Sequence, residues 1–190
     1  MKKLTTGQKT LIIVGAVILL AIFWVAGSYN GLVKADETVD EKWANVQTAY
    51  QRRIDLIPNL IATVQASADF ETNLQTQVTA MRSGLSSAAT PEDLEILGTK
   101  IESAINLVFE AYPQVRSTEN FLSLQDQLEG TENRIKTERD IYNKAVKQMN
   151  IKVRRFPTNI IAGMFGFGKK VLFEAVTGAE TAPDVTALFN

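Results

Sequence analysis

The side chains that most often carry enzyme chemistry are missing from this sequence. It contains no histidine and no cysteine. A Ser-His-Asp triad, a cysteine nucleophile, a thiolate metal site and the usual histidine-containing zinc and di-iron sites are therefore excluded. A site built from carboxylates alone is compatible with the composition, but the calcium-binding loop with oxygen ligands around a glycine is not present. We expect no catalytic residues, no metal and no cofactor, and therefore a protein that is not an enzyme.

One compact group of polar side chains stands out instead. Arg52, Arg53 and Asp55 lie within one helical turn, so at most two of them share a face. Pro58 removes a backbone hydrogen bond and frees a carbonyl of the preceding turn, which Asn59 or a neighbouring helix could satisfy. The group is either a polar network that fixes a helix kink, which we expect, or a binding site for a partner or a small anionic ligand at that kink.

This polar group lies within a segment of strong helical periodicity. Apolar residues recur at steps of three and four from Val39 to Leu85. That spacing is typical of an amphipathic helix and not of a strand. It predicts one very long helix over about residues 35–85, kinked but not stopped at Pro58, because the pattern keeps its phase there.

The helices that follow have clearer boundaries. Thr90 and Asp93 have the spacing of a capping box at the start of a helix over 91–112. A third helix is predicted over 117–154, and a short C-terminal helical segment over about 157–174. No strand pattern is present, and the short connections predict antiparallel neighbours. The fold class is therefore all-α, an up-and-down helical bundle.

An uncharged run over residues 10–33 precedes the bundle. A bilayer's hydrocarbon core is roughly 30 Å thick, which takes about 20 helical residues. A cleaved signal peptide is the alternative, but its apolar region would be shorter and would end in a small-residue cleavage site. We expect a retained transmembrane helix. Its apolar centre comprises Leu11, Ile12, Ile13, Val14, Ile18, Leu19, Leu20, Ile22, Phe23 and Trp24.

These segments give a simple organisation: a basic N-terminal segment at 1–9, the span at 10–33, a bundle at 34–174 and a tail at 175–190. The lysines ahead of the span favour an N-terminus in the cytoplasm and a bundle outside it. The net charge is only −1, which argues against a nucleic-acid-binding protein. The bilayer is therefore the first partner that the sequence predicts.

A basic and aromatic stretch follows the third predicted helix. No acidic residue occurs between Asn143 and Phe173. The stretch could be an interfacial segment drawn to anionic lipid, a short helix that packs on the bundle, or a surface for self-association. Of these we expect packing on the bundle. The candidate lipid or oligomer contacts are Arg154, Arg155, Phe156, Phe165, Phe167, Lys169 and Lys170.

Several short motifs, taken together, resemble the LemA family. They are YNGLV at 29–33, WANV at 43–46, YQRRIDLIPNL at 50–60, the pair at 112–113, and matches at 139, 142–143 and 156–174. The resemblance implies an antiparallel four-helix bundle behind one N-terminal helix in the bacterial inner membrane. It carries no catalytic residue set, and a relative in magnetosome-forming bacteria is linked to membrane organelle biogenesis. The signature positions, structural or interacting, are Trp43, Arg52, Arg53, Asp55, Pro58, Asn59, Tyr112, Pro113, Arg139, Tyr142 and Asn143.

Two functions are compatible with these features. The first is a non-enzymatic scaffold that self-associates at the membrane and organises membrane or envelope proteins. It follows from the expectation that the first bundle helix outruns its partners and leaves apolar surface uncovered. The second is a membrane-tethered sensor or adaptor, which a pocket lined by Arg52, Arg53 and Arg139 would favour. Arg139, Tyr142 and Asn143 are expected to lie near the polar group if their helices are adjacent.

Overall fold

A computed structural model describes residues 6–64, 68–113 and 118–174, and every regular element in these ranges is helical. The elements are α1 (Thr6–Val64), α2 (Ala68–Ser87), α3 (Pro91–Ala111), α4 (Glu119–Arg154) and α5 (Thr158–Phe165). This arrangement confirms the all-α class expected from the spacing of apolar residues.

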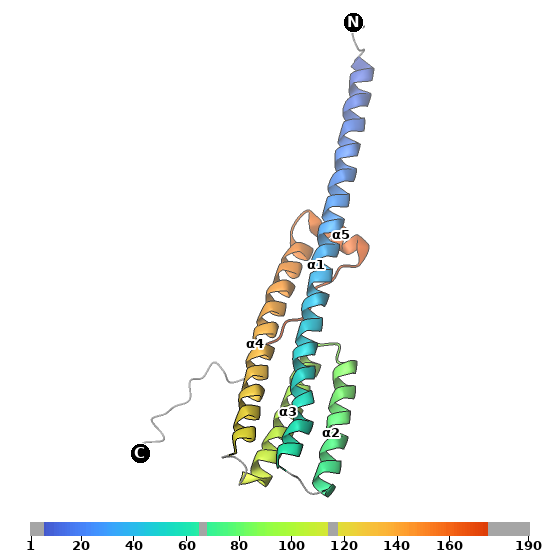
Figure 1. Cartoon of the computed structure of the whole chain (residues 1–190). Helices are drawn as coiled ribbons and strands as arrows, with labels where there is room; N and C mark the ends of the chain where they lie inside the picture. The colour runs from blue at the N-terminus through green and yellow to red at the C-terminus, as the bar shows by residue number, and fades with distance from the viewer. Residues whose placement is uncertain (1–5, 65–67, 114–117, 175–190) are drawn as a thin grey trace, which may run out of the picture.

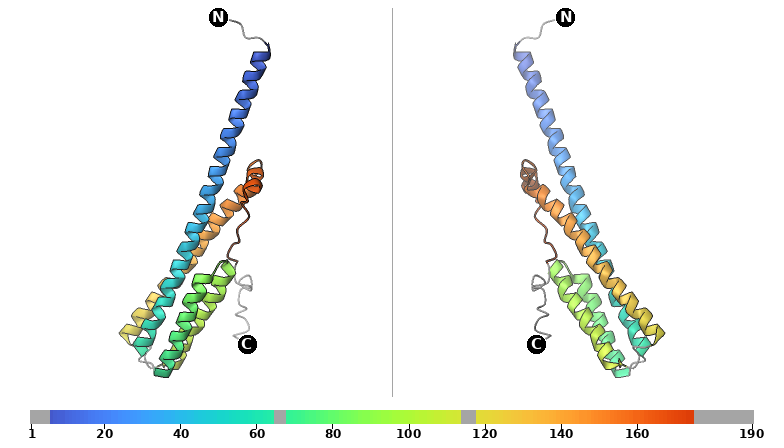
Figure 2. Two further views of the ribbon diagram at one scale, coloured as in Figure 1. Left: turned by 90° about the vertical axis from the view of Figure 1, so that its right-hand side faces the viewer. Right: turned by 90° about the vertical axis from the view of Figure 1, so that its left-hand side faces the viewer.

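The helices form an elongated up-and-down bundle (Figure 1). α1 runs the length of the molecule, α2 returns beside it, α3 turns back again, and α4 rises along α1 beyond the ends of α2 and α3. The bundle therefore has four helices at its far end and only α1 and α4, joined by α5, at the end near the N-terminus (Figure 2). α4 is the main packing partner of α1.

α1 is a single helix of 59 residues that combines two segments predicted separately. The apolar run and the first bundle helix join without a break, and the helix also continues through Pro58. Because the join is helical throughout, the orientation of the apolar run is coupled directly to that of the bundle.

The prediction of one helix over about 35–85 was wrong. α1 ends at Val64, and α2 begins at Ala68 and packs antiparallel against it. The reason is that apolar steps of three and four continue across this point, so the pattern keeps its phase although the chain reverses. Folding back allows the apolar face of α2, including Leu74 and Val78, to pack in the same core as α1.

The boundaries of α3 and α4 agree with the sequence to within two residues. Thr90 accepts a hydrogen bond from the Asp93 backbone N–H, and an Asp93 carboxylate oxygen accepts one from the Thr90 N–H at 2.9 Å. This is the predicted capping box, with Pro91 at the first helical position. α4 ends at Arg154, just before the Phe156-Pro157 pair.

The C-terminal helical segment is shorter than the expected range of 157–174. α5 stops at Phe165 because Gly166 takes a left-handed conformation with φ 77°, which favours glycine and ends the helix. Residues 166–174 then run without regular structure back along α4 and α1. We call this segment the strap.

The core is continuous along the bundle, and α4 covers the part of α1 that extends beyond α2 and α3. Leu32, Val39 and Val46 of α1 are 0–2% exposed, and Val146 and Met149 of α4 are fully buried. The expectation of a long uncovered apolar face on α1 is therefore not met within the bundle. The sequence could not show this, because it does not specify how far α4 runs beside α1.

Candidate functional site

The strap is held to α4 by two asparagine side chains. Asn143 donates from Nδ2 to the Phe173 carbonyl at 3.0 Å, and its Oδ1 accepts from the Phe173 N–H at 2.9 Å. Asn150 makes the same pair of bonds with the backbone of Lys170, both at 2.9 Å. The two asparagines lie seven residues apart, which places them on one face of α4. Each asparagine side chain supplies the hydrogen-bond partners that the backbone of an irregular segment would otherwise lack.

Aromatic contacts complete the attachment of the strap. The Trp43 ring lies 5.4 Å from Tyr142 and 6.0 Å from Phe173, and the Tyr142 hydroxyl donates to the Val171 carbonyl at 3.0 Å. The Arg139 guanidinium lies 4.6 Å from the centre of the Phe173 ring. Trp43, Tyr142 and Phe173 therefore form one aromatic cluster, with Arg139 over one of its rings, and this cluster joins α1, α4 and the strap.

The residues of the polar group at 52–59 contact different neighbouring helices. Arg53 pairs with Glu132 of α4. Asp55 accepts from Arg82 of α2 at 2.8 Å and from Gln51 at 2.9 and 3.0 Å. Residues two apart in a helix point to nearly opposite sides, about 200° around the axis, so Arg53 and Asp55 tie α1 to two different helices. The structure thus contains the expected polar network, although it joins helices and is not confined to Pro58.

Burial and hydrogen bonding shift the pKa values of Arg53, of Asp55 and of the nearby Tyr50. Burial lowers the pKa of Arg53, and its Nε has no hydrogen-bond partner among the described residues. Burial raises the pKa of the neighbouring Tyr50. Partial burial alone would raise the pKa of Asp55, but hydrogen bonds from Arg82 and Gln51 lower it overall.

The pocket expected between Arg52, Arg53 and Arg139 is not formed. Arg53 and Arg139 line one recess, but Arg139 pairs with Glu95 at 2.6 Å and the recess carries an excess of carboxylates. The acidic residues in it are Glu92, Glu95, Glu102, Glu132 and Glu174. Arg52 points elsewhere because it is the helical neighbour of Arg53. An anion would be repelled from this recess.

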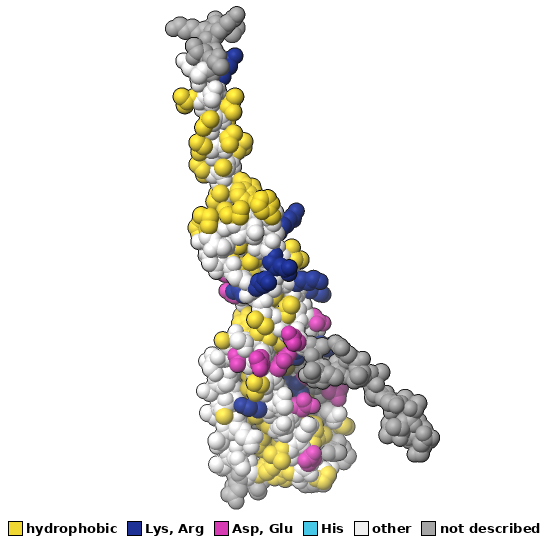
Figure 3. Space-filling model, turned by 180° about the vertical axis from the view of Figure 1, so that it is seen from behind, with side chains coloured by type: hydrophobic (Ala, Val, Ile, Leu, Met, Phe, Trp, Pro, Cys, Tyr) yellow, Lys and Arg dark blue, Asp and Glu magenta, His cyan; other side chains and the backbone are white. Residues whose placement is uncertain are grey.

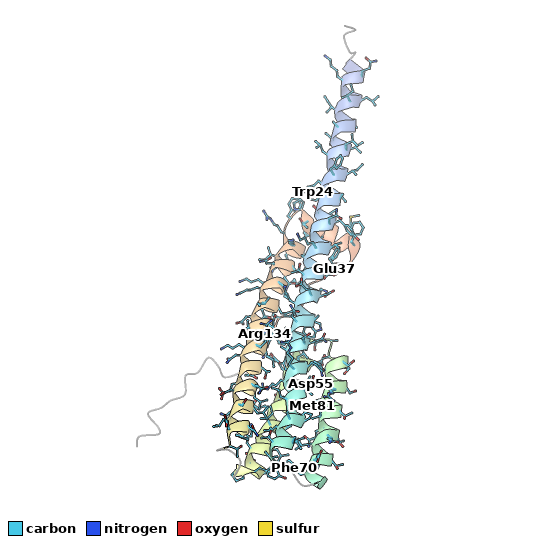
Figure 4. All side chains as sticks on the ribbon, viewed as in Figure 1. Trp24, Glu37, Asp55, Phe70, Met81 and Arg134 are labelled. Carbon is cyan, nitrogen blue, oxygen red and sulfur yellow. The ribbon has the colours of Figure 1, made fainter. Side chains whose placement is uncertain are left out.

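Arg52 lines a second recess, between α1 and α4. It has a volume of about 590 Å³, and Asn59, Gln127 and Arg134 also line it. Figure 4 shows Arg134 on α4 and Asp55 on α1 at this part of the bundle. Arg134 is paired with the buried Glu138 at 2.6 Å. This recess is the place where the polar group at 52–59 is open to a ligand.

The remaining signature and charged residues have structural contacts. The Tyr112 ring packs edge-on to Phe70 at the far end of the bundle, and Pro113 directly follows it. Lys170 pairs with Asp36 at 2.8 Å, and the hydrogen bond that its ammonium donates to the Asp36 carboxylate is the main reason why the pKa of Lys170 is raised. No group of acidic residues suited to a metal ion occurs in residues 6–64, 68–113 or 118–174.

The apolar half of α1 stands alone, away from the bundle. It is long and apolar enough to cross a membrane, with a mean hydropathy of 2.7 in its most apolar window, none of which is buried. Figure 4 shows Trp24 on α1 just before the bundle begins. Figure 3 shows hydrophobic side chains in a band at this junction, with Lys and Arg side chains beside it.

Arg139, Tyr142 and Asn143 were predicted to lie near the polar group at 52–59. Only Arg139 shares a recess with Arg53, whereas Tyr142 and Asn143 bind the strap. Asn150 was missed altogether. Its seven-residue spacing from Asn143 on the face of α4 that carries Tyr142 and Met149 was the available signal.

Comparisons with known proteins show the family to which the chain belongs. The LemA family model matches residues 42–186. Protein LemA of Metamycoplasma hominis is 24% identical over 196 residues, which cover 100% of this chain and 90% of that protein. Magnetosome proteins MamQ 1 and MamQ 2 of Paramagnetospirillum magneticum are each 30% identical over 83 residues, covering 44% of this chain and 30% of theirs. With the family model matched over most of its length, this chain belongs to the LemA family.

Proposed function

We propose that this protein is a membrane-anchored, non-enzymatic scaffold that self-associates and organises membrane or envelope proteins. The observation that carries the proposal is the continuity of α1, which contains both the apolar segment and the longest bundle helix. A bundle on such a helix is held upright at a fixed height, with no hinge at the membrane. Rigid display at a surface is the property that a scaffold requires.

A groove between α2 and α3 is the candidate contact between copies. Its α2 side carries the small residues Ala80, Gly84 and Ser87, and its α3 side carries Ile96, which is 52% exposed. Small side chains allow another helix to approach closely, and an exposed isoleucine gains by being covered. Because α4 covers the apolar face of α1, we base self-association on this groove and not on α1.

Co-isolation of two differently tagged copies from the same membranes tests this proposal. We expect the copies to be isolated together, and Ile96→Glu to reduce the yield of the second copy by placing a charge in the contact. Leu122→Glu is the matched control, because Leu122 is 50% exposed on α4 and lies outside the groove. Failure of unmodified copies to co-isolate would contradict self-association.

The orientation is part of the same proposal: the N-terminus in the cytoplasm and the bundle outside it. The chain has no cysteine, so a single Ser123→Cys substitution provides one labelling site on the exposed surface of α4, outside the groove. A maleimide that cannot cross the membrane should label this site in intact cells. Labelling only after the cells are opened would reverse the orientation.

A second candidate is a sensor or adaptor that binds a ligand in the recess of Arg52, Asn59 and Arg134. It is favoured because Arg52 is not part of an ion pair among the described residues that line the recess. Inorganic phosphate is a suitable probe. A rise in the unfolding temperature with phosphate that Arg52→Gln abolishes, and that chloride does not reproduce, would support this function over a purely structural one.

A further inference from the structure

The outer face of α5 is not covered by any part of the chain within residues 6–64, 68–113 and 118–174. Ile161 and Ala162 are 3% and 1% exposed and pack on the bundle. The apolar side chains around them point outward: Phe156 is 74% exposed, Ile160 52%, Met164 72% and Phe165 53%. An apolar surface of this density is unusual on a protein face in water. We call α5 with its flanking residues, 154–169, the collar.

Two contacts fix the level of the collar along α1. The Phe165 and Phe167 rings lie 4.8 and 5.9 Å from the ring of Tyr29. Lys152, at the end of α4, donates from Nζ to the Gly31 carbonyl at 3.1 Å. The collar therefore lies against one side of α1 at residues 29–31, which follow the isolated apolar segment (Figure 2).

The length of that segment decides what surrounds the collar. The bundle begins to cover α1 at Val25, so the uncovered apolar part at 11–24 measures only about 21 Å at ~1.5 Å per residue. A hydrocarbon core is about 30 Å thick. The difference, roughly 9 Å, matches the depth of about 5–10 Å to which interfacial helices enter a membrane. If α1 crosses the bilayer, the outer face of α5 is at the boundary between acyl chains and headgroups.

The charges around the collar are those that anionic headgroups would attract. Lys152, Arg154, Arg155 and Lys169 are exposed, and no acidic residue lies between Asn143 and Phe173. Lys170 is not part of this set because it pairs with Asp36. Basic side chains next to exposed aromatic rings are typical of segments that lie in a membrane interface. The same surface of a second copy would be repelled by these charges.

We infer that the collar is a second membrane-binding element: α5 inserts its apolar face into the interface, and its basic residues bind the headgroups of anionic lipids. This inference rests on the proposed membrane span. The span anchors the bundle to the membrane, and the collar adds a second attachment at the membrane surface on one side of α1. The lipid around the protein is then not uniform, because the collar selects acidic lipid on its own leaflet.

Spin labels at single cysteines in the full-length chain test the position of the collar. The sites are Met164→Cys in α5, Val17→Cys in the span and Ser123→Cys, which is exposed near the start of α4 and far from the membrane, in vesicles of phosphatidylcholine with phosphatidylglycerol. We expect the label at 164 to be more accessible to oxygen than to a water-soluble nickel chelate, like the label at 17 and opposite to that at 123. A label at 164 that behaves like the one at 123 would overturn the inference, while a water-accessible label at 17 would instead overturn the span.

The same labels separate lipid from protein as the occupant. A label at 164 that is shielded from both reagents, and whose spectrum is broadened until unlabelled protein is added, would show a second copy over the collar. That outcome overturns the lipid contact. Sharp spectra with high oxygen accessibility support it.

The basic residues are tested by the lipid that remains bound after mild detergent extraction. We expect phosphatidylglycerol to be enriched over its bulk fraction. Arg155→Gln with Lys169→Gln should reduce that enrichment, by on the order of fivefold for each charge removed. Lys100→Gln with Lys136→Gln is the matched control, because both lysines are exposed on the bundle away from the collar. Equal enrichment in both variants would overturn the role of these charges.

Discussion

Asn143 holds Phe173 by both polar atoms of its backbone, with hydrogen bonds of 3.0 and 2.9 Å. Through this contact and the equivalent one from Asn150, α4 fixes the strap that continues from α5. The position of α5 at the end of the bundle therefore depends on two amide side chains and on the turn at Gly166.

Asn143→Leu should release the strap without unfolding α4. The substitution removes both bonds to Phe173 and leaves a part-buried N–H and carbonyl unpaired, at a cost of about 1–3 kcal/mol. Hydrogen exchange of residues 169–174 in the full-length protein would report the release as a loss of protection. Asn133→Leu is the control on the same helix, since Asn133 is exposed. Unchanged protection of the strap in the Asn143 variant would refute this role.

Gly166→Ala should destabilise the end of α5. The left-handed φ of 77° costs an L-residue roughly 1 kcal/mol or more, although nothing would obstruct the added methyl group. Gly163→Ala is the matched control, because it lies within α5 and should stabilise the helix by about 0.5–1 kcal/mol. Denaturant unfolding in detergent measures both. The two alanine substitutions should change the free energy of unfolding in opposite directions, and changes of the same sign would contradict the role of Gly166.

The ion pair of Arg53 and Glu132 should show strong coupling. Glu132→Gln leaves the buried Arg53 without its carboxylate, and we expect a loss of about 1–2 kcal/mol, less than for a fully buried pair because Glu132 is 55% exposed. Arg53→Met combined with Glu132→Gln should recover part of this loss. A double-mutant cycle on the free energy of unfolding measures the coupling. Strictly additive effects would show that the pair does not join α1 to α4.

Asp55 should make the stability of the bundle depend on acid pH. Its pKa is lowered in the folded state, so its contribution is present above the unfolded pKa near 4 and is lost as the pH falls through the folded value. The unfolding midpoint of the natural chain should therefore fall more between pH 5 and pH 2 than that of Asp55→Asn. If the unfolding midpoints of the two proteins changed in parallel with pH, Asp55 would not contribute to the pH dependence.

Much of the fold follows from the sequence because the boundaries are chemically explicit. The capping box at Thr90 and Asp93 and the turn before Pro157 predict α3 and the end of α4 to within two residues. The reversal after Val64 could not be predicted, because the apolar spacing continues through it. The length of the C-terminal helix was overestimated because the role of Gly166 depends on its backbone angle.

The candidate sites were predicted less well, for a physical reason. Arg139, Tyr142 and Asn143 were recognised as a group, but their partners lie on the strap, about 30 residues away in sequence. The strap itself shows no periodic pattern, and the seven-residue spacing of Asn143 and Asn150 on α4 does not show which backbone the two side chains bind. Likewise, the sequence shows that the residues around α5 are basic and aromatic, but not that they pack against α1 at Tyr29.

The mass of the full-length protein in lipid nanodiscs tests the central claim most directly. A scaffold that self-associates should occupy each disc as several copies, in a fixed ratio that does not change as the supply of lipid is increased. Ile96→Glu should reduce that number, while Leu122→Glu should not. Discs that contain a single copy at every ratio of protein to lipid would contradict the scaffold and direct attention to a ligand in the recess of Arg52 and Arg134.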